Sequence, residues 1–237
     1  QAENGELQVM CEIRGVPFTG SDSASSHLAF DKLAAKRFAV LGGVTTSQGI
    51  ALENAEEALA TYGRLIAKPV KDGSSYGLMF VNARQDLVAV RKAAEDEDYL
   101  IEPFITGTEA TCAVLEQLDG SLIALPPIEI VPADGAFNYF AKYLAAATQE
   151  ICPGRFSPEI TAAIQAEAVK AHRALSCGGY SRSDFIVSAN GPVFLETNTL
   201  PGLTAASLYP KALKAQGISF VDFLHQQIAL AERRLRK

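Results

Sequence analysis

The stretch "DFIVSANGPVFLETNTLPGL", residues 184–203, contains two apolar runs that are separated by the turn signal "ANG". Such a turn between two apolar runs predicts a pair of antiparallel strands. The pairing would bring Asp184 on the first strand beside Glu196 and Asn198 on the second, and these two, two residues apart, project to the same face. Three oxygen ligands would then converge, and a site with only two carboxylates suits Mg²⁺ that also holds nucleotide phosphates.

Arg182 precedes Asp184 by two residues and therefore shares its face of the predicted strand. A cation beside the metal would stabilise the negative charge that develops in phosphoryl or acyl transfer. The alternative is a salt bridge at the strand end between Arg182 and one of the acids. We favour the metal site, because the salt bridge leaves Asn198 and the "TLPG" turn without a role.

The composition is that of a globular protein, with 237 residues, 48% of them hydrophobic, and a net charge of −6. This length suits one large domain or two smaller lobes with cores of their own. The acidic balance argues against nucleic-acid and membrane-surface partners, and the sequence has neither a membrane-spanning apolar stretch nor a secretory signal. We therefore expect a cytoplasmic protein.

Four cysteines and three histidines are scattered along the chain without a CxxC pair or another metal-binding spacing. Free, buried thiols are the favoured interpretation of the cysteines. Any metal must therefore be bound by oxygen ligands.

Hydrophobic periodicity divides the sequence into two lobes of mixed α+β structure. Residues 32–105 predict a small lobe in which short helices and strands alternate. Residues 106–237 predict a larger lobe with longer strands, the first of which turn at the hairpin dipeptide Asp119-Gly120.

Apolar residues at helical spacing predict one continuous helix over residues 25–43, with Ser26 as its cap and Gly42 as its end. A second amphipathic helix is predicted over residues 157–177, and a third over residues 218–237 closes the chain.

Lys68 lies on the apolar run "RLIAKPV", just before the glycine-serine loop "KDGSSYG". Because burying an unpaired ammonium group is costly, a bound phosphate would explain a lysine at this position. The glycines of the loop would let its backbone N–H groups approach that phosphate. The alternatives are an edge-strand lysine that faces water and a loop that is only a turn.

Glu102 and Glu109 flank the predicted junction of the two lobes. Each taken alone is better explained as a solvated loop acid. Together they mark the cleft between lobes, where a small-molecule site is expected.

Four segments in one order, "AKPVKDGSSYGL", "EPFITGTEATCAVL", "YSRSDF" and "FLETNTLPGLTAASLYPK", closely resemble the D-alanine–D-alanine ligases of the ATP-grasp superfamily. The resemblance extends over essentially the whole chain. It implies an α+β ATP-grasp fold in which two lobes clamp a nucleotide.

The resemblance implies a nucleotide-binding set in which two lysines contact the phosphates, a hinge segment reads the adenine edge and an acid binds the ribose. In this sequence the set comprises Lys32, Lys68, Ser75, the hinge Glu102, Pro103, Phe104 and Ile105, and the ribose acid Glu109.

The resemblance also implies two Mg²⁺ ions, for which Mn²⁺ can substitute, held by Asp184, Glu196 and Asn198. A second set of residues would bind the substrate or act in the reaction. Arg182 and the backbone of Gly202 would stabilise the tetrahedral intermediate, and Lys142 would reach the transferred phosphate. Ser207 would hold the carboxylate of the second amino acid, and Glu3 would belong to the substrate site. Ser74 and Tyr143 would form a hydrogen-bonded pair that ties the glycine-serine loop to the loop that closes over the site.

Residues 134–156 show no sustained period, and we expect a functional loop there. The resemblance identifies it as a lid that excludes water from an acyl-phosphate. The implied reaction joins two molecules of D-alanine with ATP, for peptidoglycan synthesis and cell shape.

Residues 1–31 resemble the remnant of an N-terminal α/β domain. We therefore expect the nucleotide and metal site to be complete and the first-substrate site to be incomplete, and a homodimer only where that domain is supplied. Two alternatives stay open, namely a ligase with another acceptor such as D-lactate or D-serine, and a nucleotide-binding fragment without ligase activity.

Overall fold

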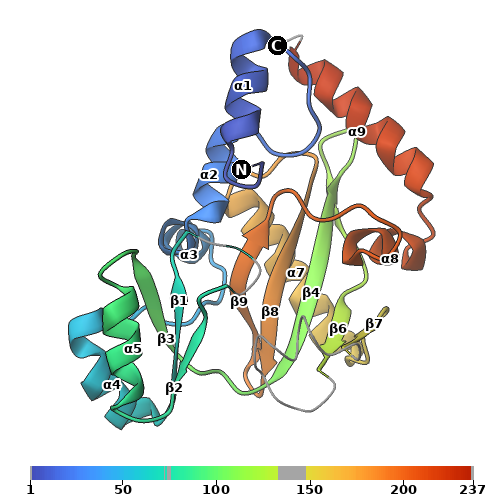
Figure 1. Ribbon diagram of the computed structural model, residues 1–237. Helices are drawn as coiled ribbons and strands as arrows, with labels where there is room; N and C mark the ends of the chain where they lie inside the picture. Colours follow the sequence, from blue (N-terminus) through green and yellow to red (C-terminus); the bar gives the residue numbers. More distant parts are fainter. Residues whose placement is uncertain (1, 72, 74–75, 133–147, 236–237) are drawn as a thin grey trace.

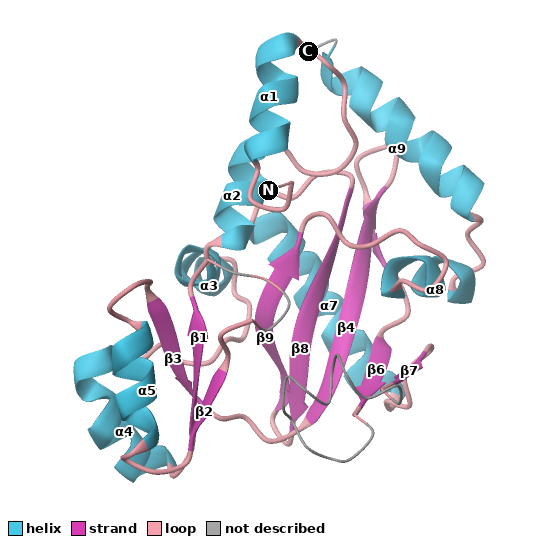
Figure 2. Ribbon diagram, viewed as in Figure 1, coloured by secondary structure: helices cyan, strands magenta, loops and turns pink. Residues whose placement is uncertain are grey.

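The computed structural model describes residues 2–71, 73, 76–132 and 148–235, and these residues form two antiparallel sheets with helices packed on them (Figures 1 and 2). The smaller sheet has three strands and the larger sheet has six. The mixed α+β architecture expected from the sequence is confirmed.

The smaller sheet has the strand order β2-β1-β3, with β1 at its centre. Two helices, α4 and α5, cover one side of it in Figure 1 and share a core with it through Leu65, Val81, Leu87 and Ile101. The elements of this lobe are the 3₁₀-helix η1 (Leu52–Asn54), α4 (Ala55–Tyr62), β1 (Leu65–Pro69), β2 (Met79–Val81), α5 (Asp86–Ala93) and β3 (Tyr99–Pro103).

Lys68 lies on β1, the central strand of this sheet, and pairs with Leu100 of β3. Its exposed fraction is 9%. The edge-strand interpretation of this lysine is therefore wrong, and the side chain needs a buried partner.

The larger sheet has the order β7-β6-β4-β8-β9, and β5 pairs with β4. The hairpin turns at Asp119-Gly120 and at residues 189–191 are confirmed, because β4 pairs with β5 and β8 with β9 in antiparallel register. The strands are β4 (Thr108–Glu116), β5 (Leu122–Ala124), β6 (Ile128–Val131), β7 (Gln149–Ile151), β8 (Tyr180–Ser188) and β9 (Gly191–Asn198).

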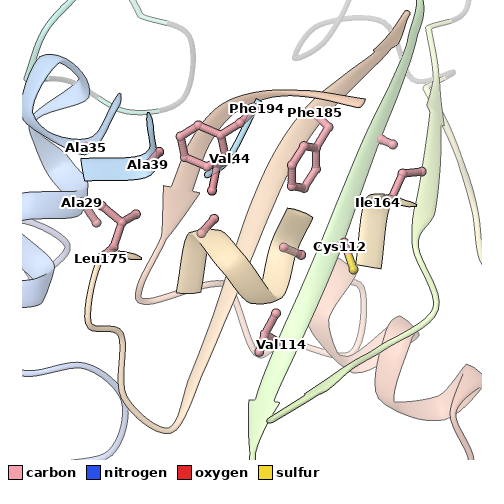
Figure 3. Packing of buried hydrophobic residues seen from close by; sticks show 13 residues of the cluster. Ala29, Ala35, Ala39, Val44, Cys112, Val114, Ile164, Leu175, Phe185 and Phe194 are labelled. Carbon is pink, nitrogen blue, oxygen red and sulfur yellow. The ribbon is translucent and has the colours of Figure 1, made fainter. Parts of the chain in front are cut away.

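One face of the larger sheet is buried under α7 (Pro158–Ala174), and Figure 3 shows the apolar cluster that fills the interface. Phe185 of β8 and Phe194 of β9 meet there edge to face, with ring centroids 6.0 Å apart. Ala35 and Ala39 of α3 (Lys32–Leu41) belong to the same cluster. Packing therefore places α3 with the larger sheet, although the boundary expected at residue 32 groups it with the small lobe.

Residues 25–43 do not form the single helix expected from their spacing. The chain forms α2 (Ser23–Phe30) and α3, with an extended residue, Asp31, between them. The Asp31 carboxylate accepts a hydrogen bond from the Ala34 backbone N–H, so it caps the second helix, and Asp22 rather than Ser26 caps the first. N-capping outweighed the helical periodicity here. The end at Gly42 is confirmed.

The far end of the larger sheet is covered by α8 (Leu208–Ala215) and α9 (Phe220–Leu235), on the face opposite α7. The C-terminal helix is thus confirmed, whereas α8, β7 and α1 (Glu6–Arg14) are absent from the sequence-based prediction. The helix capped by Ser157, α7, ends at Ala174, three residues earlier than expected. No helix in the described part of the chain is long and apolar enough to cross a membrane.

We predict that Phe223→Ala destabilises the protein by about 3–5 kcal/mol, because it opens a cavity in the apolar core between α8, α9 and the larger sheet. Phe223 of α9 is 0% exposed, and its ring centroid lies 5.4 Å from those of both Tyr180 and Tyr209. Urea unfolding measures the effect. Val221→Ala on the same helix is the control, since Val221 is 59% exposed, and equal losses for the two variants would contradict the packing.

Candidate functional site

A pocket of about 360 Å³ lies on the face of the larger sheet that α7 leaves open. It is bounded by strands β4, β6, β8 and β9, by the junction of α2 and α3, and by the loop after β1. The pocket brings together seven of the residues expected from the sequence, namely Glu3, Lys32, Glu109, Arg182, Asp184, Glu196 and Asn198.

Strand register sets the centre of the pocket. Thr111 of β4 lies opposite Asp184 of β8, and Asp184 lies opposite Glu196 of β9. Two pairs further along, and therefore on the same face, Arg182 lies opposite Asn198. The convergence of these oxygen-bearing side chains on one face is thus confirmed by the pairing.

A β-bulge makes this arrangement compatible with the buried face. Phe185 pairs with Phe194 whereas Asp184 pairs with Glu196, so Leu195 is the extra residue of β9. In a regular strand Phe194 and Glu196 would share a face, because they are two residues apart. The bulge turns Phe194 into the core and Glu196 into the pocket.

Ion pairs and hydrogen bonds hold the acids in place. Arg182 Nε lies 3.2 Å from Asp184 Oδ1, so the salt bridge considered as an alternative exists within the oxygen cluster and does not replace it. The Thr111 hydroxyl donates a hydrogen bond of 2.6 Å to the same oxygen. Lys32 Nζ lies 3.8 Å from Glu196 Oε2.

The donor set fits Mg²⁺. Asp184, Glu196 and Asn198 supply oxygen atoms, which this ion prefers. Asn198 Oδ1 accepts a hydrogen bond from the Leu200 N–H at 2.8 Å, which orients the amide and leaves one lone pair for a metal. No cluster of three His, Cys, Asp or Glu residues is found in the described ranges, so further ligands would have to come from water or from a bound anion.

A second group of charges lies between α3 and the smaller sheet. The Glu102 carboxylate contacts Lys36 through Oε1 and Lys68 through Oε2, the latter at 2.8 Å. The Ser47 hydroxyl donates to Glu102 and accepts a hydrogen bond of 2.8 Å from Lys36 Nζ. All three charged residues are at most 9% exposed. We call Lys36, Lys68, Glu102 and Ser47 the Glu102 cluster.

Electrostatics in the Glu102 cluster favour the charged carboxylate. Burial by itself raises the pKa of Glu102, but attraction from Lys68 and Lys36 and their hydrogen bonds outweigh it and hold the pKa below its ordinary value of 4.5. Burial lowers the pKa of Lys36 below its ordinary value of 10.5. Attraction from Glu102 raises the pKa of Lys36 but does not cancel this effect, and repulsion from Lys68 lowers it further. The cluster thus contains two cations for one carboxylate.

The hinge residues expected to follow Glu102 are fixed by Arg64. The backbone N–H of Phe104 donates a hydrogen bond of 3.0 Å to the Arg64 carbonyl. The Arg64 guanidinium lies 3.9 Å from the centroid of the Phe104 ring and 4.8 Å from that of Phe80. Pro103 ends β3, and Ile105 follows in the connection to the larger sheet.

Gly202 and Ser207 lie together, but neither is among the residues that line the pocket. A Cβ at Gly202 would approach Ser207 Oγ to 2.8 Å, so a larger residue at position 202 would require the Ser207 side chain to rotate. The Ser207 hydroxyl also shares a hydrogen bond of 2.8 Å with Thr204. Four residues expected in the site, Ser74, Ser75, Lys142 and Tyr143, lie outside the described residues.

Three residues of these networks are missing from the sequence-based site. Thr111 follows Glu109 by two residues and so shares its face, and Lys36 follows Lys32 by one helical turn. These spacings are signals that could have identified both residues. Ser47 lies in an irregular segment, and only the fold brings it to Glu102.

Comparisons with known proteins give one consistent result. Residues 33–229 match the family model described as "D-ala D-ala ligase C-terminus". A D-alanine–D-alanine ligase of Halalkalibacterium halodurans is 38% identical, over 97% of this chain and 78% of its own length.

Two solved structures also share the fold. The D-Ala:D-Ser ligase VanG of Enterococcus faecalis is 35% identical with a TM-score of 0.83, and the match covers 97% of this chain and 69% of that one. The D-alanine–D-alanine ligase of Bacillus anthracis complexed with ATP is 30% identical with a TM-score of 0.82, covering 99% and 77%.

We predict that Glu102→Gln destabilises the protein by about 3–5 kcal/mol, because it leaves two buried ammonium groups without their counter-ion. Urea unfolding at pH 7 measures the loss. Glu95→Gln, at an exposed position of the same lobe, is the control and should change the stability by less than about 0.5 kcal/mol.

The same variant tests the pH dependence. The folded pKa of Glu102 is below 4.5, so its contribution to stability is complete above pH 4.5 and is lost as the pH falls through the folded value. The difference in unfolding free energy between the wild type and Glu102→Gln should therefore shrink in strongly acidic solution. A difference that stays constant from pH 7 down to acid unfolding would contradict this assignment.

Proposed function

We propose that this chain, which belongs to the D-alanine–D-alanine ligase family, joins two molecules of D-alanine in an ATP-dependent, ADP-forming reaction. The observation that carries the proposal is the cluster of Asp184, Glu196 and Asn198 beside Arg182 on two paired strands, with Lys32 at its edge. Oxygen ligands for a divalent cation, with two positively charged side chains beside them, are what the transfer of a phosphoryl group requires.

The nucleotide would lie between the two lobes. Lys32 and Lys68 reach this region from α3 and β1, and they would bind the phosphates. Residues 102–105 would contact the adenine edge, and Glu109, which lines the pocket, would bind the ribose. The ATP complex of the Bacillus anthracis relative supports a nucleotide site in this fold.

Asp184, Glu196 and Asn198 would hold Mg²⁺ at the phosphates. The ion, when bound, supplies positive charge that neutralises the transferred phosphoryl group. Arg182 is already oriented by Asp184, and its guanidinium can stabilise the oxyanion that forms at the attacked carbonyl.

The reaction would proceed in two steps. The carboxylate of the first D-alanine attacks the γ-phosphorus of ATP and forms an acyl-phosphate, and ADP leaves. The amine of the second D-alanine then attacks the acyl carbon, phosphate leaves and the nitrogen loses a proton. Ser207 would hold the carboxylate of the second D-alanine, Gly202 would offer its backbone N–H to the oxyanion, and Glu3 at the pocket wall would contribute to the substrate site.

Water must be excluded between the two steps, because it hydrolyses an acyl-phosphate. We assign this task to the lid that includes Lys142 and Tyr143, together with Ser74 and Ser75 of the glycine-serine loop. The product would serve peptidoglycan synthesis, and the use of ATP and Mg²⁺ suits the cytoplasm.

The direct test measures ADP release from Mg-ATP in the presence of D-alanine, L-alanine, D-serine, D-lactate or no acceptor. Release that depends on D-alanine alone supports the proposal. Preference for D-serine or D-lactate would make the chain a ligase with another acceptor. Confirmed Mg-ATP binding without release under any condition would identify a nucleotide-binding fragment without ligase activity.

We predict that Glu196→Gln weakens Mg²⁺-dependent nucleotide binding by about tenfold or more, because a charged metal ligand becomes neutral. Calorimetric titration with a non-hydrolysable ATP analogue, with and without Mg²⁺, measures the effect. Glu95→Gln again serves as the control, and an unchanged magnesium dependence in Glu196→Gln would contradict the proposed metal site.

A further inference from the structure

Lys36 is a buried lysine to which the proposed function gives no task. It is 6% exposed, and its ammonium group contacts the Glu102 carboxylate and the Ser47 hydroxyl. A buried lysine is costly unless a specific partner compensates for the lost hydration. Lys68 already supplies Glu102 with one counter-ion at 2.8 Å, so Lys36 adds a second cation to a pair that is neutral without it.

The position of Lys36 on α3 connects it to the rest of the site. Lys32 and Lys36 are one helical turn apart and lie on one side of the helix. Lys32 faces Glu196 of the larger sheet at 3.8 Å, and Lys36 faces Glu102 of the smaller sheet. The helix is fixed at its start by the Asp31 cap, and Asp31 also lies 3.6 Å from Lys71, in the loop after β1.

The two oxygens of Glu102 are divided between the lysines. Oε1 is held by Lys36 and Ser47, and Oε2 is held by Lys68. In the proposed function Lys68 also binds nucleotide phosphates. A phosphate that draws on Lys68 would leave Glu102 as a buried carboxylate close to a polyanion, which is unfavourable unless another cation stays with it.

We propose that Lys36 is a positioning residue of the nucleotide site, which holds Glu102 through Oε1 and thereby allows Lys68 to share its ammonium group with the phosphates. The inference rests on the proposed function. This role explains why the Glu102 cluster contains two lysines and only one carboxylate. The negative charge of the bound phosphates would balance the second lysine. The lowered pKa of Lys36, caused by burial, agrees with a cluster that lacks an anion.

Substitution by methionine separates this role from a structural one. Lys36→Met keeps the length of the side chain and leaves Glu102 and Lys68 as a neutral buried pair, so the midpoint of urea unfolding should be unchanged or higher. Lys68 would then be committed to Glu102. We expect the Kd of a non-hydrolysable ATP analogue with Mg²⁺ to rise about tenfold or more, the size of one lost charge-assisted hydrogen bond.

Two further variants complete the test. Arg37→Met removes a positive charge from the neighbouring, exposed position of α3 and should leave both the Kd and the unfolding midpoint unchanged. Lys36→Arg restores the cation at Glu102 and should recover most of the affinity that Lys36→Met loses.

The outcomes are distinguishable. A wild type that does not bind the analogue would overturn the nucleotide site itself and, with it, the inference. A wild type that binds and a Lys36→Met variant that binds equally well would overturn the inference alone. A Lys36→Met variant that loses stability and affinity together, without rescue by Lys36→Arg, would show that Lys36 is structural.

Discussion

The pairing of β8 with β9 is the constraint on which the rest of the site depends. One face of this strand pair is buried under α7, and the opposite face lines the pocket. Phe194 and Glu196 are two residues apart and would share one face of a regular strand, so the bulge at Leu195 is required to bury the ring and turn the acid into the pocket. The position of Glu196 in the pocket follows from this irregularity.

The helix α3 relates the two lobes to each other. Its apolar side, with Ala35 and Ala39, packs in the core of the larger sheet. Its lysines point to acids of both sheets, Lys32 to Glu196 and Lys36 to Glu102. Because a helix is rigid over one turn, this spacing largely sets the distance between Glu196 in the pocket and Glu102 on the smaller sheet. A nucleotide bound between the lobes would therefore meet a preformed set of cations.

The buried charges of the Glu102 cluster illustrate a general relation between stability and binding. Two lysines and one glutamate enclosed together are a weak source of stability, since the cost of desolvation offsets their attraction. In the proposed function they would hold a positive potential at the place where the nucleotide phosphates bind. Arg182 and Asp184 on the larger sheet differ from this cluster, because they form a pair with one charge of each sign.

Much of the fold and of the site follows from short-range features of the sequence. Turn signals at residues 119–120 and 189–191 predicted both hairpins, and the two-residue spacing of Glu196 and Asn198 placed them on one face. These predictions hold because strand periodicity and turn geometry act over a few residues. The break between α2 and α3 at Asp31 was not predicted, because the helical pattern of apolar residues continues across it. Only the hydrogen bond from the Ala34 N–H to the Asp31 carboxylate shows that a new helix begins there.

Other features depend on contacts between distant segments, and only the tertiary structure decided them. The burial of Lys68 required β1 to lie between two strands, and the partners of Glu102 came from α3 and from Ser47, more than 50 residues away along the chain. The bulge at Leu195 arose because the core needed Phe194 while the pocket needed Glu196. The sequence by itself determined which chemical groups are available and how they alternate along each element. Their partners were decided by packing, because burial, charge pairing and strand register are satisfied only when the whole chain has folded.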